Sequence, residues 1–252
     1  MATQIYTTKE IADMVGIHVN TVRFYEEIGF LTKPERLPNG YRVYTDLQLE
    51  QCKLIRCAMK AEVLQNGLRK KAVAVVRLCA AQDFDAAIAA AEDYRSMIER
   101  EIKNAKAAIY SVEKILSENT VSEALEINGR DAAKTLGVTL ETLRTWERSG
   151  LIKVKRQENG YRIYTAADME RLNIVRTLRC ANYSLSAILR LLNGLDSQTT
   201  QSVEKLLNTP EENEDIISVC DWLILSLQNT LIDADRLLRM LGHIKENLAT
   251  LQ

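Results

Sequence analysis

Two stretches of this chain repeat each other, and the repeat is the strongest constraint on its fold. "RFYEEIGFLTKPERLPNGYRVYT" begins at Arg23, and "RTWERSGLIKVKRQENGYRIYT" begins at Arg144. The two arginines are 121 positions apart, whereas Asn39 and Asn159 are 120 positions apart, so the second copy lacks one residue in between. Because length changes fall in loops, we expect this difference to mark a loop on the exposed side of a duplicated domain.

Each copy predicts two short helices joined by a tight turn. Thr7 and Glu10 form a capping box, and Gly16 ends the helix that the box opens. A second helix is expected from Val19 to Glu27, with His18 at its N-cap. Three apolar side chains of the first helix are expected to face the core: Ile11, Met14 and Val15. The second copy assigns the same roles to Asn128, Gly137, Thr139 and Leu140–Arg148.

A β-hairpin follows the two helices in each copy. The Asn-Gly pairs at 39–40 and 159–160 lie between short β-prone runs, which is the strongest local signal for a hairpin. The returning strand alternates, so Arg42 and Tyr44 share one face. With only 10 Gly and 3 Pro in 252 residues, the rest of the chain favours helix. The expected fold is therefore mainly α, with two winged helix-turn-helix domains.

The motifs of both copies resemble the DNA-binding domain of the MerR family of bacterial transcription regulators. The pattern is TVRFYEEIGFL…NGYRVYT…IR in the first copy and TLRTWERSGLI…NGYRIYT…VR in the second. The resemblance covers most of residues 5–70 and 126–193. ANYSLSAILRLL at 181–192 fits the fourth helix of the family, whereas AEVLQNGLRKKAV in the first copy fits it poorly. The resemblance implies a regulator that binds double-stranded promoter DNA, with RNA polymerase as a further partner.

The net charge of −1 hides two basic modules in an acidic frame. Residues 1–71 hold 11 Lys and Arg against 8 Asp and Glu, and residues 128–194 hold 12 against 6. Local positive fields suit a polyanion such as DNA. The alternative is a chance pattern of solvated surface charges.

The start of the second helix is expected to enter the major groove of DNA. The base-reading residues would be His18, Asn20, Thr21 and Arg23 in the first copy and Thr139, Glu141, Thr142 and Arg144 in the second. Asn20 favours adenine, whereas Glu141 would accept a hydrogen bond from cytosine or repel phosphate. Diverged readers predict two unlike half-sites.

Further positions are expected to contact the DNA backbone. The resemblance places Arg42 and Arg162 of the wing on phosphate, and the alternative for both is a solvated surface charge. Tyr25 and Trp146 would touch the backbone or serve as core anchors. Additional contacts are expected from Lys33, Arg36, Tyr41, Lys153 and Lys155.

Two long helices are predicted, one after each winged helix. The first runs over about residues 84–118, capped by Asp83, with an alternating 3-4 stripe: Ile88, Ala91, Arg95, Ile98, Ile102, Ala105, Ile109, Val112 and Leu116. The second follows a capping box at 209–212 and runs to about Leu248. Its stripe is Ile217, Cys220, Ile224, Leu227, Leu231, Ala234, Leu238 and Leu241.

The domain order predicts a single-chain pseudo-dimer. MerR regulators dimerise through one such helix per subunit, packed antiparallel, and a link of nine residues (119–127) suits that arrangement here. The alternative is a true homodimer with four DNA-binding domains. The expected boundaries are 1–80 and 121–195 for the winged helices, 81–120 for the first long helix, and 196–252 for a connector and the second long helix.

No cofactor or metal site is expected. The five cysteines are scattered, and none forms a CxxC pair. Metal sensors of the family place a cysteine where Cys79 lies, but they need further cysteines after the long helix. A small-molecule effector has four aromatic candidates, for which core packing is the alternative: Tyr94, Tyr110, Tyr183 and Trp222.

The remaining features favour a cytoplasmic regulator over an enzyme. The chain has two histidines, no Gly-rich phosphate loop and no HExxH motif. It lacks an apolar run of about 20 residues and a signal peptide, so neither a membrane nor secretion is expected. The leading hypothesis is a transcription regulator that binds two unlike half-sites and distorts the spacer between them. The alternative is a protein that sequesters a drug or toxin on the same scaffold.

Overall fold

The computed structural model describes residues 4–60, 67–117, 126–197, 200–209 and 222–249. Its contacts divide the chain into two units. One unit comprises residues 1–100 and 227–252, and the other comprises residues 101–226. Each unit contains one winged helix, and no helix in the described part of the chain is long and apolar enough to span a membrane.

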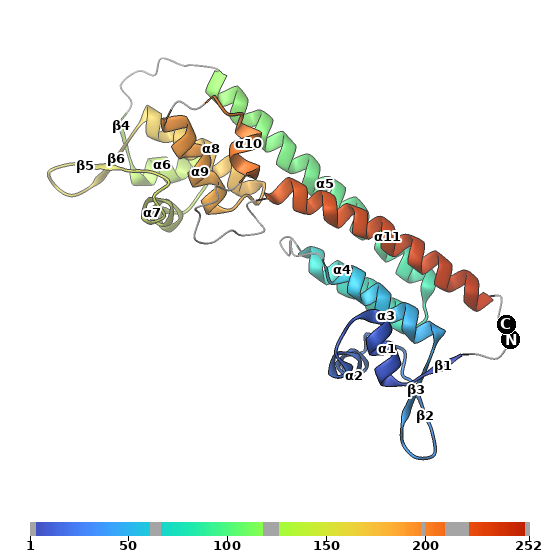
Figure 1. Cartoon of the computed structure of the whole chain (residues 1–252). Helices are drawn as coiled ribbons and strands as arrows, with labels where there is room; N and C mark the ends of the chain where they lie inside the picture. Colours follow the sequence, from blue (N-terminus) through green and yellow to red (C-terminus); the bar gives the residue numbers. More distant parts are fainter. Residues whose placement is uncertain (1–3, 61–66, 118–125, 198–199, 210–221, 250–252) are drawn as a thin grey trace. The chain divides into compact units, whose positions relative to one another are not determined.

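The first winged helix follows the predicted order of elements (Figure 1). Its elements are β1 (Ile5–Tyr6), α1 (Thr8–Val15), α2 (Val19–Glu27), β2 (Glu35–Arg36), β3 (Arg42–Thr45), α3 (Asp46–Ala58) and α4 (Leu68–Ala80). The second consists of β4 (Glu126–Asn128), α6 (Gly129–Leu136), α7 (Leu140–Arg148), β5 (Lys155–Arg156), β6 (Arg162–Thr165), α8 (Ala166–Cys180) and α9 (Leu185–Asp196). The fourth helix is therefore present in both copies, although its sequence in the first copy fits the family poorly.

The helix starts are capped by the side chains that the sequence predicted. Thr7 and Glu10 form a reciprocal capping box on α1, and Asn128 accepts from two backbone N–H groups of α6. His18 Nδ1 accepts from the Asn20 N–H at the start of α2, where the second copy uses the Thr139 hydroxyl instead. These caps satisfy backbone donors that a helix start leaves without partners.

A short N-terminal strand in each copy is an addition that the sequence did not predict. β1 pairs antiparallel with β3, which gives a three-stranded sheet in the order β1-β3-β2, and the second sheet has the matching order β4-β6-β5. The ring of Tyr44 is fully buried beneath the first sheet, and Tyr164 occupies the same place in the second. The central strand of each wing, β3 or β6, is therefore paired on both sides.

One expected core residue of α1 is wrong. Ile11 is fully buried, but Met14 is 53% exposed and Ala12 takes the inward position beside Ile11. α1 has only eight residues, and its buried face comprises Ile11 and Ala12, whereas Met14 lies on the side that faces solvent.

The extra residue of the first copy lies in the segment that leads into the wing, which contains both exposed and buried side chains. β2 and β5 pair with their partner strands in the same register, so the additional residue falls between Gly29 and Glu35. Thr32 in this segment is held by the fourth helix of the module: its hydroxyl donates to the Ala80 carbonyl at 2.7 Å. The Gln51 amide completes the link by accepting from the Thr32 N–H and donating to the Thr32 hydroxyl. Thr32 therefore links the segment that holds the additional residue to α4 and α3.

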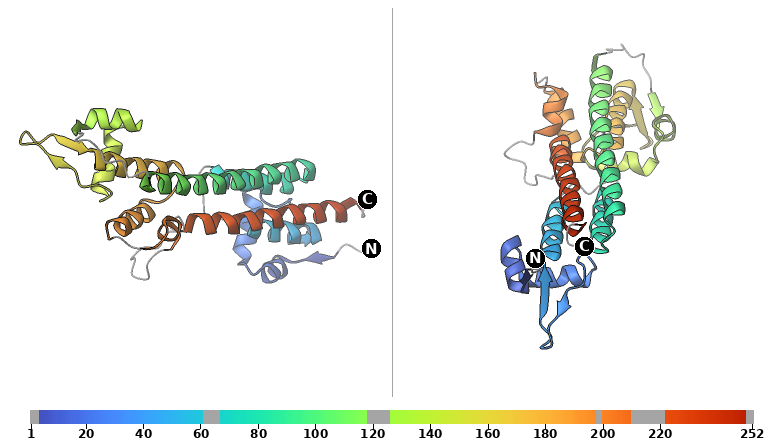
Figure 2. Two further views of the ribbon diagram at one scale, coloured as in Figure 1. Left: turned by 90° about the horizontal axis from the view of Figure 1, so that it is seen from above. Right: turned by 90° about the vertical axis from the view of Figure 1, so that its right-hand side faces the viewer.

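Two long helices follow the winged helices: α5 (Phe84–Ser117) and α11 (Leu223–Ala249). Within the first unit they run side by side and antiparallel (Figures 1 and 2), because Arg95 pairs with Asp235 while Asp85 pairs with Lys245. The seam is buried along both helices, with Thr230 as a polar member among the apolar residues Ala87, Ala91, Tyr94 and Ile98 of α5 and Leu227, Ala234, Leu237, Leu241 and Ile244 of α11.

The predicted stripe was displaced by one residue at several points. Tyr94, which is 2% exposed, fills the seam position that the sequence assigned to Arg95. Both choices keep the 3-4 alternation, but the Tyr94 ring can be buried whereas the Arg95 charge stays at the edge beside Asp235. Likewise, Leu231 and Leu238 are only half-buried.

The second unit has one helix that the sequence did not predict, α10 (Val203–Asn208). It packs on α9, where the buried Arg190 guanidinium donates to the Leu206 and Leu207 carbonyls that end α10. Thr209 ends α10 in an extended conformation. The rest of the expected capping box, together with Ile217 and Cys220, lies outside the described residues.

Candidate nucleic-acid interface

The recognition helices α2 and α7 present the expected base-reading side chains to solvent. His18, Asn20 and Arg23 are exposed on α2, and Thr139, Glu141 and Arg144 are exposed on α7. Thr21 and Thr142 are half-buried at the same turn. These positions follow from the caps: they fix where each helix begins, and the buried Val22 and Leu143 then turn the opposite face outward.

The two helices differ in charge where they would meet bases. In α7, Glu141 lies between Arg144, at 3.4 Å, and Arg148, at 2.7 Å. In α2, Asn20 accepts from Arg23 at 3.4 Å, and Glu27 stands at the position of Arg148. The copies therefore expose unlike hydrogen-bonding groups on one scaffold.

The wing arginines are held against the recognition helices by carboxylates. Arg42 Nε donates to Glu26 Oε2 at 2.5 Å, and Arg162 Nε donates to Glu147 Oε2 at 2.6 Å. A second wing residue joins each pair, with Arg36 3.8 Å from Glu26 and Arg156 3.3 Å from Glu147. Sequence reasoning missed both glutamates. A signal was available, because each copy has a glutamate directly after the aromatic residue (YE and WE) and the arginine of NGYR in the wing. Each arginine keeps further N–H donors for phosphate.

The two aromatic candidates on the recognition helices differ in exposure. Tyr25 is half-buried and packs near Phe30, with ring centroids 6.4 Å apart. Burial is the largest cause of the raised pKa of the Tyr25 hydroxyl. Trp146 is only 5% exposed, which favours the core-anchor alternative for this residue.

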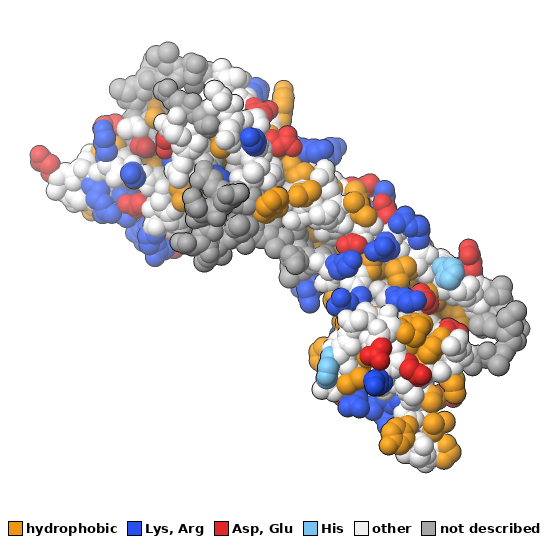
Figure 3. All heavy atoms as spheres, viewed as in Figure 1, with side chains coloured by type: hydrophobic (Ala, Val, Ile, Leu, Met, Phe, Trp, Pro, Cys, Tyr) orange, Lys and Arg blue, Asp and Glu red, His pale blue; other side chains and the backbone are white. Residues whose placement is uncertain are grey.

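The tips of the wings are exposed and differ in polarity. Tyr41 and Tyr161 are each 72% exposed beside the Asn-Gly turns. The first tip also exposes Leu37, and Figure 3 shows apolar side chains gathered there. Gln157 and Glu158 take the corresponding positions in the second tip. Phe24, which is 52% exposed on α2, is another surface aromatic that sequence reasoning did not single out.

The remaining backbone candidates are exposed cations near the wings. Lys33, Arg36, Lys153 and Lys155 all face solvent. Arg36 and Lys155 lie on the outer strands β2 and β5, so exposed cations flank the held arginines of β3 and β6.

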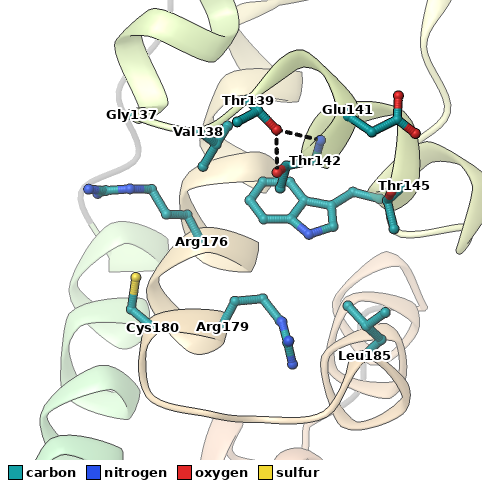
Figure 4. Close-up of a pocket in the computed structure, with 11 residues that line it drawn as sticks. Gly137, Val138, Thr139, Glu141, Thr142, Thr145, Arg176, Arg179, Cys180 and Leu185 are labelled. Carbon is teal, nitrogen blue, oxygen red and sulfur yellow. Dashed lines mark hydrogen bonds between the residues drawn. The ribbon is translucent and has the colours of Figure 1, made fainter.

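A hollow of about 530 Å³ lies beside the start of α7. Figure 4 shows Arg176 and Arg179 of α8 and Leu185 of α9 around it, below Thr139 and Thr142. The Glu141 carboxylate points away from the two arginines of α8 in this view. Arg179 donates to the Tyr183 carbonyl at 2.6 Å, which fixes the turn into α9.

The four aromatic effector candidates do not share one environment. Tyr94 is buried in the seam of the first unit, and Tyr183 is fully buried in the second. Both have raised pKa values caused mainly by burial. Tyr110 is 70% exposed beside a hollow of about 310 Å³ that Lys106, Glu113 and Glu204 also line, and Trp222 is 37% exposed.

The described cysteines behave mostly as apolar side chains. Cys52, Cys57 and Cys79 are buried, whereas Cys180 is exposed. Burial raises the pKa of Cys52 and of Cys79 to about 12, so both remain thiols at neutral pH. In the described part of the chain, no group of three or more His, Cys, Asp or Glu residues is placed to hold a metal ion.

Comparison with known families and proteins agrees with this geometry. The family described as MerR family regulatory protein matches residues 7–44, and the MerR HTH family regulatory protein matches residues 128–195. A probable heavy metal-dependent transcriptional regulator of Haemophilus influenzae is 40% identical over 67 residues, which is 26% of this chain and 52% of the relative. The CueR regulator of Escherichia coli is 43% identical over 49 residues, covering 19% of this chain and 36% of the relative. No solved structure matches the chain.

A third relative is covered over most of its length. The mercuric resistance operon regulatory protein of Bacillus cereus is 31% identical over 117 residues, which is 46% of this chain and 80% of the relative. The chain spans about half of the Haemophilus influenzae relative and most of this one. With two family matches placed on the two winged helices, the chain belongs to the MerR family of transcription regulators.

Proposed function

We propose that the chain is a sequence-specific transcription regulator that holds a promoter through two unlike half-sites and distorts the spacer between them. The observation that carries this proposal is the pair of winged helices with exposed recognition helices of different charge. Phosphate contacts from the wings would position each module, and base contacts from α2 and α7 would give the sequence preference. RNA polymerase would then meet a promoter of altered shape.

Distortion of the spacer has an energetic requirement. Bending a site of promoter length smoothly costs on the order of 1–6 kcal/mol, and contacts that the bend makes available must offset that cost. Two modules carrying held wing arginines and flanking lysines supply such contacts. A small-molecule effector would act by changing how firmly the two modules hold the bent site.

We further propose that the chain acts as a single-chain pseudo-dimer. The antiparallel pairing of α5 and α11, through Arg95–Asp235 and Asp85–Lys245, supports an arrangement in which one chain supplies both helices of the family's dimer interface. Sedimentation over a wide range of protein concentrations tests this point. We expect the 28.5 kDa monomer throughout, whereas a species of twice that mass would indicate a homodimer.

A DNA footprint on the region upstream of the gene, at two salt concentrations, tests the regulator itself. We expect salt-sensitive protection of two unequal half-sites on one face of the duplex, because counterion release makes phosphate contacts salt-dependent. Four protected major-groove segments would instead indicate a homodimer. Absence of protection at low salt, on this region and on random DNA, would refute the regulator and favour small-molecule sequestration.

A further inference from the structure

Glu141 lies between two arginines on the exposed surface of the second recognition helix. Its Oε1 accepts from Arg148 Nη2 at 2.7 Å, and its Oε2 lies 3.4 Å from Arg144 Nη1. All three side chains are more than half exposed, at 61%, 69% and 55% for Glu141, Arg148 and Arg144. Ion pairs this exposed contribute little to folding stability. The cluster therefore calls for an explanation other than holding α7 together.

The first recognition helix carries a different arrangement at the same positions. Asn20 replaces Glu141, and its Oδ1 accepts from Arg23 at 3.4 Å. Glu27 replaces Arg148, so α2 has a neutral reader followed by an acidic residue one turn beyond Arg23. The charges on either side of the shared arginine therefore differ between the two helices: neutral and acidic in α2, acidic and basic in α7.

The chemistry of the two readers points to different bases. An asparagine amide pairs bidentately with the N6 and N7 edge of adenine, whereas a carboxylate accepts from the N4 amino group of cytosine. An unpaired carboxylate at this place would also repel the phosphates on either side of the groove. Arg148 and Arg144 compensate that charge, and each occupies a different carboxylate oxygen. Because a carboxylate has about four acceptor positions, Glu141 still has lone pairs for a base.

Resting on the proposed function, we propose that Glu141, positioned by Arg148, makes the second half-site select cytosine where the first selects adenine. Glu141 is the specificity-determining residue, and Arg148 is a positioning residue that acts through it. Thr139 caps the helix independently of both, since its hydroxyl accepts from the Thr142 N–H at 3.1 Å. Substitution at 141 or 148 therefore leaves the helix start intact.

Selection of binding duplexes from a randomised pool by the full chain tests the reader. For the wild type we expect two half-site sequences that include one position with C in one half and A in the other. Glu141→Asn should move that position toward A in one half only, and Asn20→Glu should move it toward C in the other half only. The change in preference should be on the order of tenfold, the range of a single base-reading pair.

Binding constants on the selected duplex and on its C-to-A variant test the positioning role. Arg148→Gln should weaken binding to the C-containing duplex severalfold more than binding to its C-to-A variant. Arg148→Lys keeps a positive charge within reach of Glu141 and should restore most of the preference. A purely electrostatic contact of Arg148 with phosphate would instead weaken both duplexes equally and reduce the salt dependence by about one ion.

Two outcomes would overturn the inference while leaving the regulator intact. The first is a wild-type consensus that Glu141→Asn leaves unchanged. The second is a Glu141→Asn variant that binds every duplex more tightly without a changed preference, which would make Glu141 only a repulsive charge. If the wild type enriches no sequence, the proposed function fails together with the inference.

Discussion

Glu147, which holds the wing residue Arg162, could either orient that arginine for DNA or repel DNA through its charge. Removing the charge changes DNA affinity in opposite directions for these two roles. Glu147 accepts from Arg162 at 2.6 Å with both side chains mostly buried, at 20% and 28% exposed, and from Arg156 at 3.3 Å. Glu147→Gln keeps the shape and one acceptor oxygen but removes the charge. A hydrogen bond to a charged group contributes about 1.5–3 kcal/mol and a neutral one about 1 kcal/mol. The exposed Arg156 pair adds at most about 1 kcal/mol.

The expected loss of unfolding free energy is therefore about 1–2 kcal/mol for the second module. For DNA binding, the substitution frees the Arg162 side chain from one orientation. If this freedom costs about 1 kcal/mol of binding free energy, affinity for DNA falls about fivefold. Electrostatics alone has the opposite sign, because removing a negative charge beside DNA should tighten binding. The measurement is fluorescence anisotropy on a footprinted duplex at several salt concentrations.

Glu158→Gln at the wing tip is the matched control, since this exposed carboxylate has no ion pair among the described residues. It should leave binding unchanged or slightly tighter. Glu26→Gln tests the same contact in the first module, where Arg42 lies 2.5 Å from Glu26. If Glu147→Gln binds more tightly and its salt dependence rises by about one ion, Glu147 only competes with phosphate and the orienting role is refuted.

Three further changes test the fold. Thr32→Ala should cost about 1–3 kcal/mol, because it removes the hydroxyl that Ala80 and Gln51 share, whereas the exposed neighbour Lys33→Ala should cost under about 0.5 kcal/mol in the same urea titration. Ile98→Ala should cost about 2–5 kcal/mol as a fully buried seam residue, and a loss below about 1 kcal/mol would mean that α5 and α11 do not pack as described. Stability should fall as pH rises from about 9 toward about 12, since burial raises the pKa of Cys52, Cys79 and Tyr94 to about 12 and the unfolded chain loses these protons first. Urea titrations at several pH values in this range measure the fall.

The winged helices could be predicted from the sequence because their signals are local. Capping residues, turn glycines and the Asn-Gly pair act within a few residues, and the bounds of α2 and α7 agree with the prediction. The site residues were named from the same segments. What could not be predicted depends on long-range contacts: β1 forms only because β3 offers an open edge, and the Glu147–Arg162 pair joins a helix to a strand.

The seam shows where periodicity alone is insufficient. Residues 91, 94 and 98 and residues 91, 95 and 98 both fit an alternating helix stripe, so spacing cannot choose between Tyr94 and Arg95. The partner helix decides, because Asp235 lies where it can hold the Arg95 charge at the edge. The same reasoning applies to Thr32, whose role depends on the carbonyl that ends α4.

The antiparallel pair of α5 and α11 also changes what a single mutation can do. In an interface between two identical subunits, every substitution appears twice, and a change that suits one side must be tolerated on the other. Here Arg95 and Asp235 belong to one coding sequence and meet once. Substitutions can therefore accumulate in α5 and in α11 independently, and a change of base preference in one winged helix does not alter the other.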